Sequence, residues 1–595
     1  MGDNKNLNSV LCTLYSKTNS SHKEKGDKHM YIVAKDGSGD FTSIQQAIDA
    51  IPAGGRTPTI LLIRMNEYQE RVVVDKDNVR IIGEARDRTI ITAKGCALDK
   101  DENGNDRGTF LSATFIVMGN NVEVENLTIR NDAGDGRDVG QAVAVYAAGD
   151  RGVWRNVRMI AHQDTLFCGP LMQKVINFYG GRRGRAEVVE FVGDCPPTQS
   201  RQYFEDCFIQ GDVDFIFGPY RCWFERCTLF MNKRGGMYTA ANTPEIQPYG
   251  LVFHQCRLTG ECEEGQGFLG RPWRRFSRTV FLDCDMDEHV APQGFADWDE
   301  IKVVTERYAE YGTTGVRADQ SPRHPSQKRM NAEEAACYTI PDVIGGPDGW
   351  QPDKRTPTWF LCGDSTMANY PEAVYPMMGW GQKLQSLLPE NVFVENCAVN
   401  GRSSKSFIAE KRLNFIELCL RKGDKLIVSF SHNDEKPDAE RSTNPRITYP
   451  EYLGMYIDAA RRQGAEPILV TPIPRRLFSD DGKLVPTHGP YPDAMRDLAA
   501  YRGVRLVDLE KAAAQLFSKL GAEGTKRIFC HVPAGSKNYP DGLQDNSHLR
   551  EEGAVRIAML FLNRLQSPGQ PEAELEKAEA ADFSGLVAAE DSVLC

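Results

Sequence analysis

The sequence lacks several features that would each indicate a particular class of protein. No apolar run approaches the roughly 18 residues that a membrane-spanning helix needs. The net charge of −11 gives no basic excess, which binding to nucleic-acid phosphates requires. Cysteine pairs with the CxxC spacing of zinc sites are also absent. We therefore expect neither a membrane, nor a nucleic acid, nor a zinc ion as a partner.

The N-terminal residues 1–30 are polar and lack both the apolar segment and the small-residue cleavage site of a secretory signal. We expect this leader to be disordered. The 16 cysteines are spread over 595 residues, and we expect most of them to be reduced and buried. These observations predict a cytoplasmic location. A secreted protein whose signal is missing from this sequence would look the same, so secretion stays the alternative.

A repeat runs through the first half of the chain. Short apolar runs of strand length, each bounded by Gly, Asn or Asp, begin at Thr59. A cysteine recurs in successive repeats at spacings of 20, 29 and 28 residues, as Cys207, Cys227, Cys256 and Cys284. This period predicts a solenoid, and strands so short and apolar favour a parallel β-helix in which the cysteines stack inside. A metal site made of these cysteines is disfavoured because no His accompanies them.

Four short motifs interrupt these repeats. They are Gln141-Ala-Val-Ala-Val145, Gln163-Asp-Thr-Leu166, Asp214-Phe-Ile-Phe-Gly218 and Leu269-Gly-Arg-Pro-Trp273. Because neighbouring coils of a parallel solenoid lie about 4.8 Å apart, residues distant in sequence can form one site. Asp214 is the most informative residue, since a carboxylate among apolar neighbours is costly unless an Arg or hydrogen-bond donors meet it.

The motifs and their order resemble those of the pectin methylesterase family, over about residues 31–350. The resemblance implies a right-handed parallel β-helix that hydrolyses the methyl esters of polygalacturonate without a metal or another cofactor. It implies that Asp214 is the nucleophile, that Asp164 acts as general acid and then as base, and that Arg271 orients Asp214. The alternative, that both Asp residues are turn residues of a solenoid, is disfavoured because several motifs match together.

The same resemblance implies further residues of the site. Gln141 and Gln163 would form the oxyanion hole, where neutral amides donate to the developing negative charge. Trp273, Phe167 and Phe215 would bind the substrate, with the indole of Trp273 stacked on a sugar.

One segment departs from the family pattern. Gly169 to Ser200 is an insertion between the two catalytic Asp residues, and it carries Arg182-Arg-Gly-Arg185. We expect it to form a loop beside the cleft. The loop either supplies positive charge for a galacturonate carboxylate or is only a solvated loop, and both readings stay open.

The periodicity changes in the second half of the chain. Residues 351–357 contain two Pro residues and are the best candidate for a linker. From residue 358 to 566, strands and helices alternate, which predicts a doubly wound α/β domain with a flavodoxin-like parallel sheet. Residues 567–595 form a polar tail with no candidate site. We therefore predict a multidomain protein, a β-helix followed by an α/β domain.

Polar segments follow the strands of this second domain. They are Gly363-Asp-Ser-Thr366, Asn396-Cys-Ala-Val-Asn-Gly-Arg402, Ser429-Phe-Ser-His-Asn-Asp434 and Asp545-Asn-Ser-His548. Ligands of such sheets bind beyond the carboxyl ends of the strands, where these segments belong. The segments resemble those of the SGNH (GDSL-type) hydrolases, most closely the rhamnogalacturonan acetylesterase branch.

This resemblance implies an acyl-transfer triad. Ser365 is the expected nucleophile, His548 its base, and Asp545 the residue that orients the imidazole. The side chain of Asn433, with the backbone N–H groups of Ser365 and Gly401, would form the oxyanion hole. The order Ser, Asp, His suits such a triad, although the GxSxG turn of the α/β-hydrolases is absent.

Together the two halves predict a bifunctional pectin-deesterifying enzyme. The N-terminal domain would release methanol from galacturonate methyl esters, and the C-terminal domain would release acetate. The expected partners are pectin, homogalacturonan and rhamnogalacturonan oligosaccharides. Two alternatives stay open for the C-terminal domain, a general or xylan acetylesterase and a non-catalytic carbohydrate-binding module.

Overall fold

The computed structural model describes residues 30–52, 54–55, 58–101, 103–170, 201–304, 307–389 and 392–566. The chain divides into two compact units, one formed by Lys28–Arg355 and the other by the described residues from Thr356 on. Almost all of the predicted leader, the predicted insertion and the predicted tail lie outside the described residues.

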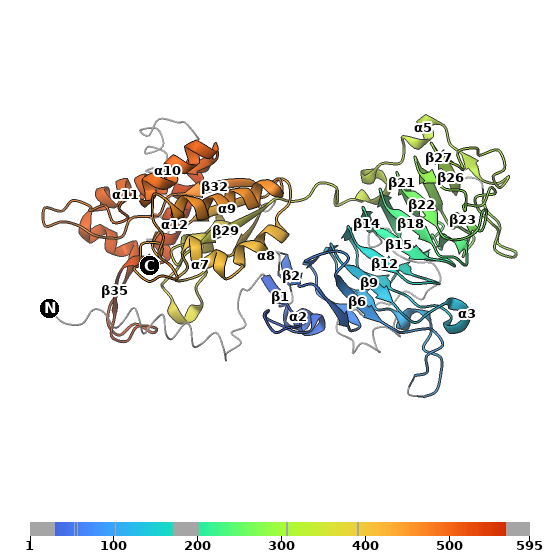
Figure 1. Ribbon diagram of the computed structural model, residues 1–595, viewed down its shortest axis with the longest axis horizontal. Coiled ribbons are helices and arrows are strands. Elements are labelled where there is room, and N and C mark those ends of the chain that lie inside the picture. Colours follow the sequence, from blue (N-terminus) through green and yellow to red (C-terminus); the bar gives the residue numbers. More distant parts are fainter. Residues whose placement is uncertain are drawn as a thin grey trace, which may run out of the picture. The chain divides into compact units, whose positions relative to one another are not determined.

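The first unit is a parallel β-helix whose coils stack from β1 to β28 (Figure 1). Its described strands form three long parallel sheets. The 11-stranded sheet contains, in spatial order, β1 (Met30–Val33), β2 (Thr59–Ile63), β5 (Val79–Gly83), β8 (Val122–Glu125), β11 (Gly152–Arg155), β14 (Arg201–Glu205), β17 (Arg221–Glu225), β21 (Leu251–His254), β24 (Thr279–Leu282), β26 (Tyr308–Tyr311) and β28 (Lys328–Arg329). The nine-stranded sheet contains β27 (Thr314–Gly315), β25 (Asp285–Met286), β22 (Arg257–Gly260), β18 (Thr228–Met231), β15 (Phe208–Gly211), β12 (Arg158–Ile160), β9 (Thr128–Asn131), β6 (Thr89–Ala93) and β3 (Asn66–Gln69). The six-stranded sheet contains β20 (Thr239–Ala241), β16 (Ile216–Gly218), β13 (Leu166–Cys168), β10 (Val145–Ala147), β7 (Phe115–Val117) and β4 (Val72–Val74).

Smaller elements complete this unit. A two-stranded parallel sheet is formed by β19 (Gly236–Met237) and β23 (Gly267–Phe268). The described helical segments are α2 (Ile44–Ala50), a 3₁₀ turn (Thr109–Ser112), α3 (Gly136–Val139), α5 (Ala332–Ala335) and a π-helical turn (Pro341–Gly345).

The turns between the 11-stranded and nine-stranded sheets explain the repeat. At six of these turns one polar residue adopts the left-handed conformation, with φ between 49° and 59°. Asn and Asp tolerate this region better than most residues do, which accounts for the Asp that precedes Cys207 and Cys284. Arg226 and Gln255 adopt the same conformation before Cys227 and Cys256. These turn residues are Asn126, Asn156, Asp206, Arg226, Gln255 and Asp283.

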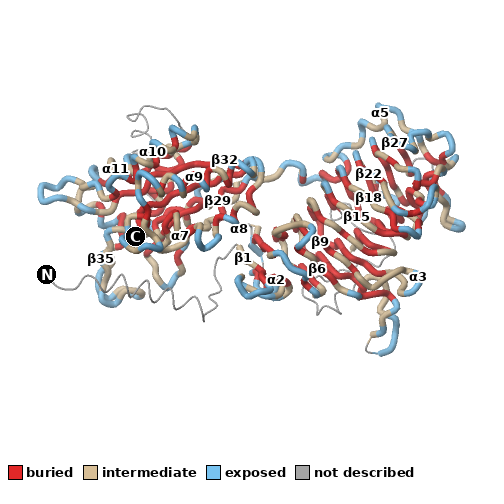
Figure 2. The backbone as a smooth tube through the Cα atoms, in the orientation of Figure 1, coloured by how far each residue is buried: buried red, intermediate tan, exposed pale blue. Residues whose placement is uncertain are grey.

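The interior of the solenoid is filled by columns of like residues, one from each coil. The four repeat cysteines are free thiols with at most 1% of their surface exposed, as the sequence predicts. A second column stacks aromatic rings with centroids 4.4–4.6 Å apart, from Phe204, Phe224, Phe253 and Phe281. Figure 2 shows the resulting buried interior along the coils. Such close packing makes the coils a rigid platform for a site.

The second unit is a doubly wound α/β domain, as predicted. Its five parallel strands have the flavodoxin-like order β30-β29-β31-β32-β33, in which the first strand of the sequence lies between the second and third. The strands are β29 (Thr358–Gly363), β30 (Phe393–Asn396), β31 (Lys425–Ser429), β32 (Glu466–Val470) and β33 (Arg505–Val507), and an antiparallel hairpin follows, β34 (Phe529–Val532) and β35 (Leu543–Leu549).

The described helices of this unit connect the strands (Figure 1). They are α6 (Leu384–Leu387), α7 (Ser404–Ala409), α8 (Arg412–Cys419), α9 (Thr448–Arg462), α10 (Tyr491–Arg502), α11 (Leu509–Gly524) and α12 (Glu551–Gln566), with 3₁₀ turns at Glu372–Val374, Trp380–Lys383 and Thr525–Arg527. The switch point of the sheet lies between β29 and β31, where a ligand site is expected.

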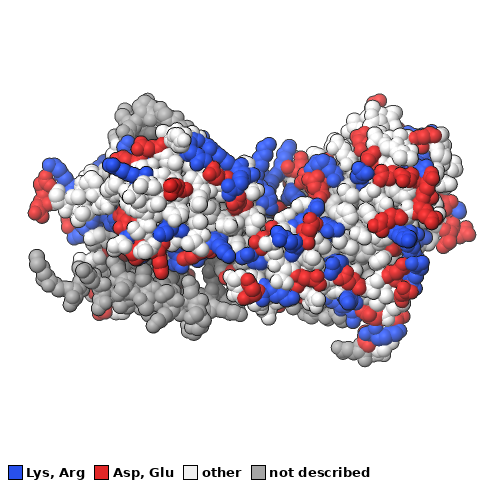
Figure 3. Space-filling view, in the orientation of Figure 1, with Lys and Arg blue, Asp and Glu red and all other residues white. Residues whose placement is uncertain are grey.

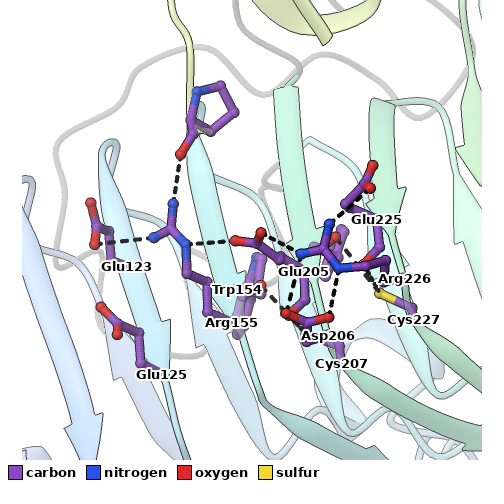
Figure 4. A network of polar contacts seen from close by, with 12 residues as sticks. Glu123, Glu125, Trp154, Arg155, Glu205, Asp206, Cys207, Glu225, Arg226 and Cys227 are labelled. Atoms are coloured by element: carbon purple, nitrogen blue, oxygen red, sulfur yellow. Dashed lines mark hydrogen bonds and ion pairs between the residues drawn. The ribbon is translucent and has the colours of Figure 1, made fainter. Parts of the chain in front are cut away.

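A ladder of ion pairs crosses neighbouring strands of the 11-stranded sheet (Figure 4). Arg155 Nε lies 3.0 Å from Glu205 Oε2, and Arg226 Nη2 lies 2.7 Å from Glu205 Oε1. Arg155 also donates from Nη2 to the carbonyl of Pro352 at 2.6 Å. The ladder therefore fixes the segment that follows the solenoid against its side.

Charge is mixed over the surface. Figure 3 shows basic and acidic side chains interspersed on the visible face of both units. No helix within the described ranges is long and apolar enough to span a bilayer. Within the same ranges, no group of three or more His, Cys, Asp or Glu side chains is arranged to hold a metal ion.

Candidate active sites

The two Asp residues of the β-helix unit occupy equivalent positions on adjacent coils. Asp164 and Asp214 each stand two residues before a strand of the six-stranded sheet, and Leu166 of β13 pairs in register with Ile216 of β16. Both Asp residues adopt the left-handed conformation, with φ of 66° and 52°. The Asp164 N–H donates to the carbonyl of Val213 at 3.1 Å. Strand register thus brings the two carboxyl groups together.

Arg271 forms a bidentate salt bridge with one of these carboxylates. Its Nε and Nη2 atoms donate to Oδ1 and Oδ2 of Asp214 at 2.9 and 2.7 Å. The Arg271 backbone N–H donates to the carbonyl of Thr239 at 3.0 Å, which places Arg271 on the coil next to β20. The indole of Trp298 lies under the guanidinium, with the ring centroid 3.8 Å from Cζ. This cation–π contact fixes the plane of the guanidinium.

The environments of the two carboxyl groups move their pKa values apart. Burial, then the charge of Asp214, raises the pKa of Asp164 well above its usual range. Burial also raises the pKa of Asp214, but the hydrogen bonds and charge of Arg271 oppose that rise. The result is one carboxyl group poised to keep its proton and one poised to ionise, the arrangement that acid and nucleophile require.

The two amides predicted for the oxyanion hole lie on neighbouring coils. Gln141 precedes β10 and Gln163 precedes β13, and the Ala142 N–H donates to the carbonyl of Gln163 at 3.2 Å. Within the described ranges, neither side-chain amide hydrogen-bonds to another residue. Both amides therefore keep donors for a ligand.

The three predicted substrate-binding aromatics have different surroundings. Trp273 is partly exposed and packs edge-on against Phe217, with centroids 5.9 Å apart. Phe167 is fully buried beneath this pair, 4.8 Å from Phe217. Phe215 is fully buried inside the solenoid against Tyr238. Burial contradicts the expectation that Phe167 and Phe215 touch a substrate; Phe167 supports the Trp273 platform and Phe215 belongs to the core.

The second unit brings its three predicted catalytic residues into one hydrogen-bonded chain. Ser365 follows β29, and its Oγ lies 2.9 Å from Nε2 of His548 on β35. His548 Nδ1 lies 2.7 Å from Oδ2 of Asp545. The backbone N–H groups of Ser547 and His548 donate to the other oxygen of Asp545, at 2.7 and 2.9 Å. The carboxylate is thus fixed from two sides, and it fixes the imidazole.

Electrostatics suit His548 to act as a base. Burial by itself would raise the pKa of Asp545, but the charge and hydrogen bonds of His548, together with the backbone donors, lower it to about 2. Burial favours the neutral imidazole of His548 and would lower its pKa. The charge of Asp545 outweighs this effect of burial, so the pKa of His548 is raised. The imidazolium that forms when Ser365 loses its proton is stabilised accordingly.

The predicted oxyanion-hole residues lie at the carboxyl ends of β29 and its neighbours. The Val399 N–H donates to the carbonyl of Gly363 at 3.0 Å, which anchors the turn containing Gly401 to the end of β29. Gly401 has φ of 77°, and nothing lies within 4 Å of where a Cβ would stand. Asn433 donates from Nδ2 to the carbonyl of Arg402 at 3.1 Å. Gly401 therefore faces open space beside the end of β29, which Ser365 follows.

Several contacts at these sites were not anticipated from the sequence. The indole of Trp298 contacts Arg271, and His162 contacts Asp212 beside the catalytic residues. In the second unit, Arg441 Nη1 donates to Oδ1 of Asn433 at 3.3 Å. Trp298 and Arg441 lie outside any motif, so no spacing signal could have found them. His162 and Asp212 lie just before two of the motifs, and a His and an Asp at these matching positions on neighbouring coils were a usable signal.

Comparison with known proteins gives a family for each unit. A family model described as Pectinesterase matches residues 30–178 and 196–347. A model described as the GDSL-like Lipase/Acylhydrolase family matches residues 361–555.

Individual relatives match the same two regions. Rhamnogalacturonan acetylesterase RhgT of Bacillus subtilis is 41% identical over 213 residues, covering 36% of this chain and 90% of the relative. Probable pectinesterase/pectinesterase inhibitor 23 of Arabidopsis thaliana is 30% identical over 343 residues, covering 55% of this chain. The chain spans about half the length of that plant relative, 54%. The solved structure of pectin methylesterase PemA from Erwinia chrysanthemi is 28% identical, with a TM-score of 0.44, and covers 54% of this chain and 97% of that chain.

Proposed function

Because the chain belongs to the pectinesterase family and, in its C-terminal part, to the GDSL-like lipase/acylhydrolase family, both of them carboxylic ester hydrolases, we propose that it removes two kinds of ester from pectic polysaccharides. The N-terminal unit hydrolyses galacturonate methyl esters and releases methanol. The C-terminal unit hydrolyses acetyl esters on pectin and releases acetate. The observation that carries the proposal is the presence of two separate, complete sets of reacting groups, one in each unit.

In the N-terminal unit the ionised carboxylate of Asp214 attacks the ester carbonyl carbon. Asp164 donates its proton to the departing methoxide, which leaves as methanol, and the galacturonyl group stays bound to Asp214. Asp164, now ionised, takes a proton from a water molecule that hydrolyses this intermediate, and both carboxyl groups return to their starting states. The raised pKa of Asp164 and the Arg271 grip on Asp214 support this division of roles.

The amides of Gln141 and Gln163 stabilise the oxyanion in this scheme. Preorganised donors that hydrogen-bond to the developing negative charge typically contribute about 10²–10³ in rate. Neutral donors also suit a polyanionic substrate, since they do not hold the free carboxylates of neighbouring galacturonate residues too tightly. The lack of other hydrogen bonds at both amides within the described residues supports this role.

In the C-terminal unit Ser365 Oγ attacks the acetyl carbonyl carbon while His548 Nε2 takes the hydroxyl proton. His548 then gives that proton to the sugar oxygen as the sugar hydroxyl leaves, and an acetyl-Ser intermediate forms. Water hydrolyses the intermediate with His548 again as base, releasing acetate. The backbone N–H groups of Ser365 and Gly401 and the side chain of Asn433 receive the oxyanion.

The test is to measure methanol and acetate released from methylated, acetylated pectin by the intact chain and by two variants. We expect Asp214→Ala to abolish methanol release only, and Ser365→Ala to abolish acetate release only. Each variant is the control for the other, because the unaltered unit should keep its product. Thermal unfolding of both variants shows whether the altered unit is still folded. If Ser365→Ala changes neither product, the acetylesterase part of the proposal is wrong.

A second measurement separates the alternatives for the C-terminal unit. A fluorophosphonate labels an activated Ser covalently, so we expect labelling of the intact chain and none of Ser365→Ala. A carbohydrate-binding module would not react. If labelling occurs but acetate comes only from acetylated xylan, the unit is an acetylesterase of neutral polymers.

A further inference from the structure

His162 and Asp212 lie beside the catalytic residues of the β-helix unit, and the mechanism above uses neither. His162 immediately precedes Gln163 and Asp164, and Asp212 stands two residues before Asp214. His162 Nδ1 lies 3.0 Å from Asp212 Oδ2, and the Asp212 N–H donates to the carbonyl of His162 at 3.0 Å. A side-chain contact and a backbone contact thus join the two catalytic loops.

The two partners differ in exposure. The side chain of Asp212 is fully buried, whereas 39% of the His162 side chain is exposed. The charged groups of the described residues that face this pair are Arg234, whose Nη1 lies 3.8 Å from Asp212 Oδ1, Asp135, 3.6 Å from the same Arg234 atom, and Arg137, which pairs with Asp135. A buried carboxylate at this position has an electrostatic effect on its neighbours that water screens poorly.

We propose that His162 and Asp212 are a positioning pair that holds the two catalytic loops together and sets the electrostatic field at Asp164. The inference rests on the proposed methylesterase function of the N-terminal unit. The charged groups with the largest effect on Asp164 are Asp214, Arg271 and Asp212. The negative charge of Asp212 disfavours the ionisation of Asp164, and the positive charge of protonated His162 offsets part of that effect.

The sign of each contribution follows from these charges. Asp164 must carry its proton to release methanol, so activity falls on the alkaline side as pH rises through the pKa of Asp164. Removing the charge of Asp212 lowers that pKa. Removing the positive charge of His162 raises it. The hydrogen bond to Asp212, ahead of the opposing effect of burial, raises the pKa of His162 above its ordinary value, which keeps the imidazole protonated to higher pH.

The experiment measures kcat/KM for methanol release against pH with the full chain. The variants are Asp212→Asn, His162→Gln, which keeps an N–H donor for Asp212, and the double variant. We expect the alkaline limb of the profile to move to lower pH in Asp212→Asn, by on the order of one pH unit. In His162→Gln it should move to higher pH by a smaller amount, because 39% of the His162 side chain is exposed and water screens its charge. The double variant lacks both charges, so its alkaline limb should lie between those of the two single variants.

Asp206→Asn is the matched control. Asp206 is a left-handed Asp on another turn of the same solenoid, and its carboxylate pairs with the exposed Arg226. We expect its pH profile to equal that of the wild-type chain. Thermal unfolding of every variant shows whether a lost activity reflects lost folding, and the opposite directions expected for two contacting residues cannot arise from unfolding.

The outcomes separate the inference from the function on which it rests. If the wild-type chain releases methanol but the profiles of Asp212→Asn and His162→Gln coincide with it, or both move in the same direction, the positioning pair is refuted and the methylesterase function stands. If the wild-type chain releases no methanol from methylated pectin, both the function and the inference are refuted.

Discussion

Asp164 and Asp214 stand at the same register position on adjacent coils, yet Arg271 forms its bidentate hydrogen bonds with Asp214 alone. Two carboxyl groups with nearly the same backbone and burial are therefore made chemically different by one guanidinium. The difference favours ionisation of Asp214 and protonation of Asp164, because one has a cation at hydrogen-bond distance and the other has an anion nearby.

Arg271 should therefore control both the rate and the acid limb of methanol release. Two charge-assisted hydrogen bonds contribute about 3 kcal/mol or more, so we expect Arg271→Ala to lower kcat by about a hundredfold or more. Because Arg271 holds down the pKa of Asp214, its loss also moves the acid limb to higher pH. Arg271→Lys keeps the positive charge but not the bidentate geometry, so its kcat and its acid limb should lie between those of the wild-type chain and of Arg271→Ala. An unchanged acid limb in Arg271→Ala would contradict the assignment of Asp214 as the ionised nucleophile.

For the triad of the second unit we predict that a substitution shifts the acid limb in the opposite direction. His548 must be neutral to accept the proton of Ser365, so acetate release should rise as pH increases through the raised pKa of His548. Asp545→Asn removes the charge that raises this pKa, and we expect the acid limb of the residual activity to move to lower pH. We also expect kcat to fall by about 10³–10⁴-fold.

Acetate release by Asp545→Asn across the pH range is the measurement, and methanol release by the same preparation is its control. The N-terminal unit does not contain Asp545, so its activity should not change. An acid limb that stays in place in Asp545→Asn would mean that another group titrates there.

Trp273 and Phe215 should respond differently to substitution, although both were predicted to bind substrate. Trp273 is partly exposed, so Trp273→Ala should raise KM for methylated oligogalacturonide with little loss of stability. Phe215 is enclosed in the core, so Phe215→Leu should leave KM unchanged and lower the unfolding free energy by about 1 kcal/mol or more. Steady-state kinetics and thermal unfolding of both variants test the correction. A raised KM in Phe215→Leu at unchanged stability would restore the original prediction.

The position of Phe215 shows where sequence reasoning reached its limit. The motifs placed the catalytic candidates well, because a solenoid converts a regular period into a fixed register between coils. The direction of a single side chain is a finer property. Asp214 adopts a left-handed conformation, which breaks the strand alternation, so Phe215 and Ile216 both join the inner core while Phe217 lies on the other face with Phe167. Alternation alone would not place these two neighbours together.

Contacts between distant segments were equally hard to anticipate. Trp298 lies 27 positions beyond Arg271 in a stretch without periodicity, and Arg441 reaches Asn433 from a loop. Such contacts depend on how loops fold back over a scaffold, and no local pattern encodes that geometry. Ser365, Gly401 and Asn433 were easier to place, because the order of the sheet brings the carboxyl ends of β29, β30 and β31 to one edge. Asp545 and His548 lie on β35 of a separate hairpin, so only their motif indicated them.

Arg201 should contribute strongly to the stability of the β-helix unit, because its ion pair is buried. It begins β14 with only 1% of its side chain exposed, and it pairs through Nε and Nη2 with both oxygens of the buried Asp150, at 3.1 and 2.7 Å. It also donates to the carbonyl of Gly345 at 2.8 Å and to Asp348. Arg201→Met removes the main partner of the buried Asp150 carboxylate and leaves Arg151 Nη1, at 3.4 Å, as a weaker one. Removing one partner of a buried pair typically costs about 3–5 kcal/mol.

Denaturant unfolding of the N-terminal unit, followed by loss of methanol release, measures this cost against a matched surface substitution. Arg226 also bridges strands of the 11-stranded sheet through several carboxylates, but 44% of its side chain is exposed (Figure 4). Water screens such pairs, so Arg226→Met should cost less than about 1 kcal/mol. Equal unfolding midpoints for the two variants would contradict the argument from burial. A double variant, Arg201→Met with Asp150→Asn, should recover part of the loss, because it removes the orphaned charge as well as its partner.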